Sequence, residues 1–269
     1  MCLSTLNRHR LLSASLLGLC ALVAVAGLLL FRNSAADHAK LGDRRAAEGN
    51  YREAAERYSR AVNKENTNVG YLEKWRDALS KQTPTEQVRY SNAFNQYVSA
   101  LRQLAIVQPD NVEAQRAYLE LTAGRLNPNA FDRDGNDFLT READTLLAAR
   151  GDARGPWDVL RRYRGLARLR LLANTPDAKA ELDAQARADL EAASAADPAD
   201  AEVAQGLEAY WSYKAFRADA DARPEDAAAA RAAGAEVVRA FLANNPGSGA
   251  MQLTALRRDL ADLVRDLQA

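Results

Sequence analysis

The strongest structural signal in this chain is LGDRRAAEGNYREAAERYSRA, residues 41–61. Gly49 and Asn50 separate two runs of helix-forming residues, which predicts two short antiparallel helices joined by a tight turn. Small residues would let the helices approach and two tyrosines would fill the space beside them: Gly42, Ala54, Ala61, Tyr51 and Tyr58. Such a hairpin cannot bury its apolar face alone, so we expect further helices to stack against it.

Residues 36–66 resemble a tetratricopeptide repeat (TPR), through the spacing of Leu41-Gly42, Gly49-Asn50-Tyr51 and Ala54-x3-Tyr58-x2-Ala61. The resemblance implies an array of antiparallel helix hairpins that binds other proteins or peptides and has no catalysis of its own. The family favours Trp, Tyr and Pro where this chain has His38, Arg45 and Asn66. If the resemblance extends to ligand use, the first helix of the hairpin offers a binding face with Asp37, Lys40, Arg44 and Arg45.

The rest of the chain repeats the same order of features with different residues. Amphipathic helical patterns end at Asx/Pro turns around Pro109, Pro198 and Pro246, spaced more widely than the roughly 34 residues of a regular TPR. We therefore predict an all-α fold, a TPR-like α-solenoid preceded by one transmembrane helix. The soluble region divides into TPR-like repeats at 36–123, an acidic loop rich in Asx, Gly and Pro at 124–139, and degenerate helical repeats at 140–269.

Residues 11–31 carry no charged side chain, and arginines flank them. A helix of this length rises roughly 30 Å, enough to cross a bilayer core. A cleavable signal peptide with its cleavage site at residues 24–26 is the alternative, but the apolar run continues past that site. We favour an uncleaved, bacterial-type signal anchor after a short head of residues 1–10. Because long domains translocate largely regardless of charge, we expect a single-pass protein whose soluble domain is extracytoplasmic, on the periplasmic side.

Composition narrows the classes of function. The formal net charge is zero, which does not favour a nucleic-acid partner. Both cysteines and both histidines lie near the N-terminus, at Cys2, Cys20, His9 and His38. The body of the chain therefore lacks the residues of a zinc site or of a nucleophile–histidine pair, and we expect no enzyme. A non-catalytic subunit or arm of a membrane enzyme complex is the further alternative.

Residues 132–136 begin like a calcium loop of the EF-hand type, with oxygen ligands at alternating positions. The pattern then departs from that type, because Asp137 stands where glycine is needed and Ala143 where a bidentate glutamate is needed. One hypothesis is a calcium-binding helical module at 132–144, using Asp132, Asp134, Asn136 and Glu142. The other is an acidic loop between repeats, in which Thr140 caps the next helix. No other cofactor is expected.

Charge is unevenly distributed along the second half of the chain. Residues 161–170 hold five arginines, whereas residues 177–208 hold nine acidic residues against one lysine and one arginine. One interpretation is a basic groove for an acidic or phosphate-bearing ligand, lined by Arg161, Arg162 and Arg164. The interpretation we favour is that a basic helix lies beside an acidic one and their charges pair, because helices joined by a short turn are normally neighbours.

Overall fold

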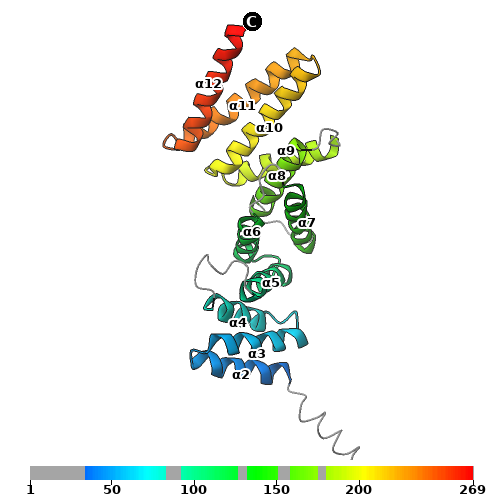
Figure 1. The fold of residues 1–269 in the computed structure, drawn as a ribbon, viewed down its shortest axis with the longest axis vertical. Coiled ribbons are helices and arrows are strands. Elements are labelled where there is room, and N and C mark those ends of the chain that lie inside the picture. The colour runs from blue at the N-terminus through cyan, green and yellow to red at the C-terminus, as the bar shows by residue number, and fades with distance from the viewer. Residues whose placement is uncertain (1–33, 83–91, 127–131, 151–157, 175–179, 269) are drawn as a thin grey trace, which may run out of the picture. The chain divides into compact units, whose positions relative to one another are not determined.

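The computed structural model describes residues 34–82, 92–126, 132–150, 158–174 and 180–268. Within these ranges every regular element is an α-helix, which confirms the all-α prediction (Figure 1). The chain forms two compact units, residues 1–97 and 98–269. The helices are α2 (Ala35–Ala47), α3 (Tyr51–Lys64), α4 (Val69–Ser80), α5 (Asn92–Val107), α6 (Val112–Leu126), α7 (Arg133–Arg150), α8 (Asp158–Ala173), α9 (Ala180–Ala196), α10 (Ala201–Ala220), α11 (Pro224–Asn244) and α12 (Gly249–Gln268).

The first hairpin, α2 and α3, begins and turns at residues with clear local reasons. Ser34 caps α2 by accepting a hydrogen bond from the Asp37 amide, and the Asp37 carboxylate accepts one from the Ser34 amide in return. Gly49 has a φ of 76°, a left-handed conformation that glycine adopts without strain. Asn50 then caps α3 through the Glu53 amide. The turn and both helix N-termini of this hairpin therefore rest on local capping and turn residues.

Close packing between α2 and α3 depends on small residues, as predicted. A methyl group on Gly42 would lie 2.5 Å from Cε1 of Tyr58, so only glycine leaves room for this ring. Ala54 and Ala61 are completely buried. The Tyr58 hydroxyl donates to Asp43 at 2.8 Å, and Lys74 of α4 donates to the same carboxylate at 2.8 Å. A single carboxylate thus links α2, α3 and α4.

In the second unit each helix from α6 to α12 packs against the next one in the chain. Alternate helices also touch: α6 contacts α8, α8 contacts α10, and α10 contacts α12 (Figure 1). This pattern arises when hairpins stack side by side, because the first helices of successive hairpins then form one layer. The second unit therefore has the packing of a helical repeat, with α6, α8, α10 and α12 in the shared layer.

One core cluster of this unit lies where α8, α9 and α10 meet. Eight buried residues from these helices form one apolar cluster: Leu166, Leu169, Leu172, Leu190, Ala193, Val203, Leu207 and Tyr210. Gly206 allows the close contact between α8 and α10, since a methyl group there would lie 2.7 Å from Cδ2 of Leu166. Burial of this apolar surface is the main stabilising term for the layer.

One prediction, the extent of a loop, is wrong, and another, the membrane anchor, concerns residues that the structure does not describe. The prediction of a loop through residue 139 is wrong from Arg133 onward, because α7 begins there rather than at about residue 140. Asp132 starts the helix by accepting a hydrogen bond from the Gly135 amide, and Thr140 lies inside the helix instead of capping it. The predicted anchor at 11–31 lies outside the described residues. Among the helices that are described, none is long and apolar enough to cross a membrane.

Candidate functional site

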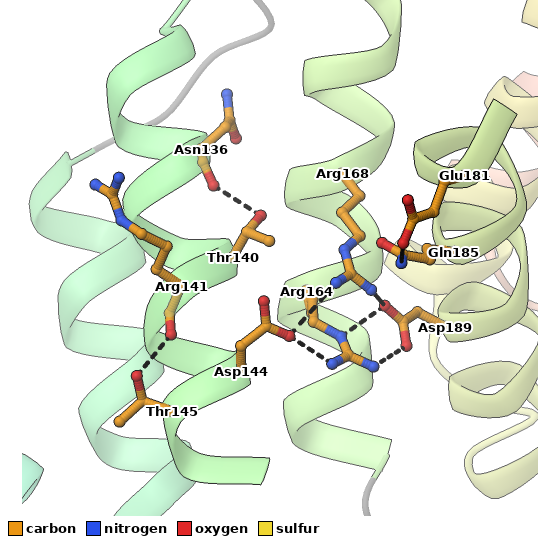
Figure 2. A network of polar contacts seen from close by, with 10 residues as sticks. All are labelled: Asn136, Thr140, Arg141, Asp144, Thr145, Arg164, Arg168, Glu181, Gln185 and Asp189. Atoms are coloured by element: carbon orange, nitrogen blue, oxygen red, sulfur yellow. Dashed lines mark hydrogen bonds and ion pairs between the residues drawn. The ribbon is translucent and has the colours of Figure 1, made fainter. Parts of the chain in front are cut away.

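The basic residues of α8 pair with acidic residues on both neighbouring helices. Asp189 of α9 accepts hydrogen bonds from Nη2 of Arg164 and from Nη1 of Arg168, both at 2.6 Å (Figure 2). On the other side, Asp144 of α7 accepts from Nη1 of Arg164 at 2.6 Å. Three consecutive helices are thus joined through two guanidinium groups.

This network is mostly buried, and its groups compensate one another. The Asp189 side chain is 6% exposed and that of Arg168 is 9% exposed, whereas that of Asp144 is 46% exposed. Burial alone would lower the pKa of Arg164, but Asp189 and Asp144 outweigh it and the pKa is raised. Arg164, a candidate for partner binding in the sequence, is therefore held inside the array. Its contacts are those that the charge-pairing interpretation describes.

Arg162 is engaged in a second set of contacts, at the start of α10. Its Nε donates to Asp200 at 2.5 Å and its Nη2 donates to Glu202. Asp200 is also the N-cap of α10, since it accepts hydrogen bonds from the amides of Glu202 and Val203. Arg162 therefore fixes α8 against the first turn of α10. The third arginine of the candidate groove, Arg161, is half-buried on α8.

A hollow lies beside Arg162, on the layer of alternate helices. It has a volume of about 300 Å³ and adjoins a smaller one of about 160 Å³. The two share Glu120, Arg162 and Tyr163 in their walls. We call this surface the α6–α8–α10 groove and define it by its polar and aromatic residues, Arg116, Glu120, Arg162, Tyr163, Arg170, Asp197, Asp200 and Glu202.

Tyr163 is the central aromatic residue of the groove. The Arg162 guanidinium lies over its ring, 4.9 Å from the centroid. Burial raises the pKa of Tyr163 to about 12. The phenol is protonated at neutral pH and can donate a hydrogen bond. Sequence reasoning did not single out this tyrosine. A tyrosine among arginines carries no local signal, because its position in a groove depends on helices distant in the sequence.

The groove combines an aromatic ring with side chains of both charges that are still partly available. Arg170 and Glu202 are 3.8 Å apart, with side chains 31% and 51% exposed, so their contact is weak. At about 300 Å³ the hollow is at the lower limit of the roughly 300 to 1,000 Å³ of small-molecule pockets, and it has room for a few side chains of a larger partner. A larger hollow of about 390 Å³ lies over α10 and α11, but Glu236 is the only charged residue in its wall.

The candidates on the first hairpin lie on α2. Lys40 and Arg44 are exposed. Asp37 is used in the capping box with Ser34, and Arg45 pairs with Glu48 at 2.8 Å and with Glu53 at 3.0 Å. Both of these ion pairs are solvent-exposed and so contribute little to stability. Two of the four candidates are thus in local contacts, and two extend from the helix surface.

The candidate calcium ligands are not brought together. Asp132 caps α7, Asp134 is exposed, and the buried Asn136 amide donates to the Asp132 carbonyl at 2.7 Å. Glu142 lies two turns further along the same helix, roughly 12 Å from Asp134 along the axis. Arg102 and Tyr118 already bind it, at 2.6 Å and 2.7 Å. In the described part of the chain, no group of three or more His, Cys, Asp or Glu residues could hold a metal ion.

Glu142 has a structural role in place of the predicted role of a calcium ligand. Burial acts to raise the pKa of its carboxyl group, but hydrogen bonds from Arg102 and Tyr118 outweigh this and the pKa is lowered. The carboxylate thereby joins α5, α6 and α7.

Comparison of the chain with protein-family models finds no match, and comparison with curated proteins finds none either.

Proposed function

We propose that this chain is a TPR-like scaffold that binds other proteins through the α6–α8–α10 groove and is held at the periplasmic side of a membrane by residues 11–31. The observation that carries the proposal is the contact between alternate helices α6, α8, α10 and α12. Such a layer presents equivalent surfaces of successive hairpins side by side. An extended peptide or a helix can then contact several hairpins at once.

The composition of the groove favours a peptide over a metabolite. Tyr163 offers a ring to an apolar or cationic side chain, and Arg170 can exchange its weak contact with Glu202 for an acidic side chain of a partner. Both signs of charge are present, so recognition would depend on the order of charges along the partner. The proposal includes no catalytic step.

The proposal is tested by reversing charges within the groove. The variant Glu120→Arg/Arg170→Glu keeps the net charge but exchanges the two signs across the hollow. The matched control is Arg52→Glu/Glu56→Arg on α3, where an exposed pair is exchanged in the same way. Both proteins, as full chains in detergent, would be used to capture partners from solubilised membranes. We expect proteins bound by the wild type and the control to be lost from the groove variant. Equal capture by all three would contradict the proposal.

A further inference from the structure

The last helix, α12, exposes a row of leucines. Their exposed fractions are 48% for Leu253, 65% for Leu256, 60% for Leu260, 56% for Leu263 and 79% for Leu267. They are spaced alternately by three and four residues, which is the a/d spacing of a coiled coil. We call them the leucine row. A row of this spacing forms a narrow seam that fits another helix better than it fits a flat surface.

The opposite side of α12 attaches it to the array. Met251 is fully buried in a cluster with Ala204, Val238 and Phe241. Arg258 donates to Glu208 of α10 at 2.6 Å and to the backbone carbonyl of Arg231 in α11 at 2.6 Å. Met251 and Arg258 occupy position f of the heptad, directly across the helix from a and d. The leucine row therefore faces away from the helices on which α12 packs.

The charges of α12 favour a second copy of the same helix over a membrane. Residues 257–266 contain three arginines and three aspartates, so the helix lacks the basic face that attracts anionic lipids. In a parallel pair, Asp259 at g meets Val264 at e, and Gln252 at g meets Arg257 at e. An antiparallel pair would instead place Arg257 near Arg257 and Asp259 near Asp259. Only the parallel arrangement avoids like charges beside the seam.

The exposed area sets the expected strength of this contact. The row amounts to roughly three whole leucine side chains per copy, or about 300 Å² if one leucine carries about 100 Å². Interfaces below about 1,200 Å² in total belong to weak, reversible complexes. Attachment of both copies to one membrane would raise their effective concentration and favour pairing.

From these observations we propose that α12 pairs with α12 of a second copy, as a parallel two-stranded coiled coil through the leucine row. The inference concerns a surface separate from the α6–α8–α10 groove and does not depend on it. Self-association would place two grooves in one assembly, so that two sites could bind one partner together.

The mass of the full chain in detergent tests the pairing. Sedimentation equilibrium at tens of micromolar protein should show a dimer that dissociates on dilution. Leu256→Glu/Leu263→Glu should give monomers at the same concentrations, with unchanged helical circular dichroism because both side chains are mostly exposed. The control Phe216→Glu introduces the same charge at a residue of α10 that is 69% exposed, and should leave the dimer intact. A monomeric wild type, or a double variant with the mass of the wild type, would overturn the proposal.

Disulfide trapping tests the orientation. In a Cys2→Ser/Cys20→Ser background, Leu256→Cys and Leu263→Cys occupy position d, where identical residues meet in a parallel pair. We expect each to form covalent dimers at least several-fold faster than Asp262→Cys, an exposed position c. Equal rates for all three variants would contradict pairing through the leucine row. If Leu256→Cys formed a disulfide only with Leu260→Cys, and not with itself, the parallel orientation would be contradicted.

Discussion

Replacing Asp189 with asparagine would remove the carboxylate that Arg164 and Arg168 share. Breaking a buried ion pair by removing one partner costs about 3–5 kcal/mol, because an uncompensated charge stays buried. Asp144 still contacts both guanidinium groups but is 46% exposed, so it compensates only in part. We therefore expect the lower end, about 3 kcal/mol, which is roughly a hundredfold increase in the opening constant of α8 and α9.

Native-state hydrogen exchange of the full chain in detergent measures this change locally. Amides of α8 and α9 should lose protection, whereas those of α2 and α3, in the other unit, should keep it. The control Glu191→Gln lies on the same helix as Asp189 and breaks an exposed pair with Arg187, so its effect should be under about 1 kcal/mol.

A triple variant separates charge from packing. Arg164→Met/Arg168→Met/Asp189→Leu removes the buried charges together and leaves only Asp144, which is 46% exposed. Replacing a buried ionic cluster by apolar residues is often neutral or stabilising. We expect α8 and α9 to regain protection close to that of the wild type. Our reasoning would be refuted if Asp189→Asn behaved like Glu191→Gln, or if the triple variant lost as much protection as Asp189→Asn.

Three further outcomes follow from the structure. Gly42→Ala should destabilise α2 and α3 by about 1–3 kcal/mol in hydrogen exchange, because its methyl group would overlap the Tyr58 ring; unchanged protection would refute the close packing. The pKa of Glu142 is lowered from 4.5, because hydrogen bonds from Arg102 and other partners outweigh the effect of burial. The stability that Glu142 contributes is therefore complete above pH 4.5, and it is lost as the pH falls through the pKa that Glu142 has in the folded protein. Glu142→Gln should abolish this acid-dependent loss in denaturant titrations of α7, and an unchanged pH profile would contradict it. Burial, together with nearby cations, lowers the pKa of His38 from 6.5, so the first unit should lose stability as the pH falls below 6.5. His38→Phe should remove this pH dependence. If the dependence persists in the variant, another group causes it.

Local signals made the first hairpin predictable. The turn at Gly49, the cap at Asn50 and the small residues facing Tyr58 all act within residues 34–64, so single residues report the outcome. The start of α7 was not predictable in the same way. Gly135 and Asn136 favour a loop by propensity, yet both are buried in the helix. Tertiary burial outweighed their local preference.

The candidate site was only partly predictable, for a related reason. Opposite charges on neighbouring helices indicated pairing, and Asp189 meets the arginines of α8 as that pattern predicts. The groove was not foreseen, because Glu120, Tyr163 and Glu202 lie on three helices separated by other segments of the chain. Only the contact of alternate helices brings them together.

The most direct test of the scaffold proposal is photo-crosslinking in native membranes. A photoreactive phenylalanine analogue would replace Tyr163 in the groove, or Phe216, an exposed aromatic residue of α10 outside it. Mass spectrometry would identify the adducts. We expect Tyr163 to yield discrete adducts with other proteins, suppressed by Glu120→Arg/Arg170→Glu, and Phe216 to yield no such adducts. Adducts at neither position, or adducts at Tyr163 that persist in the charge-reversed variant, would contradict binding through the groove.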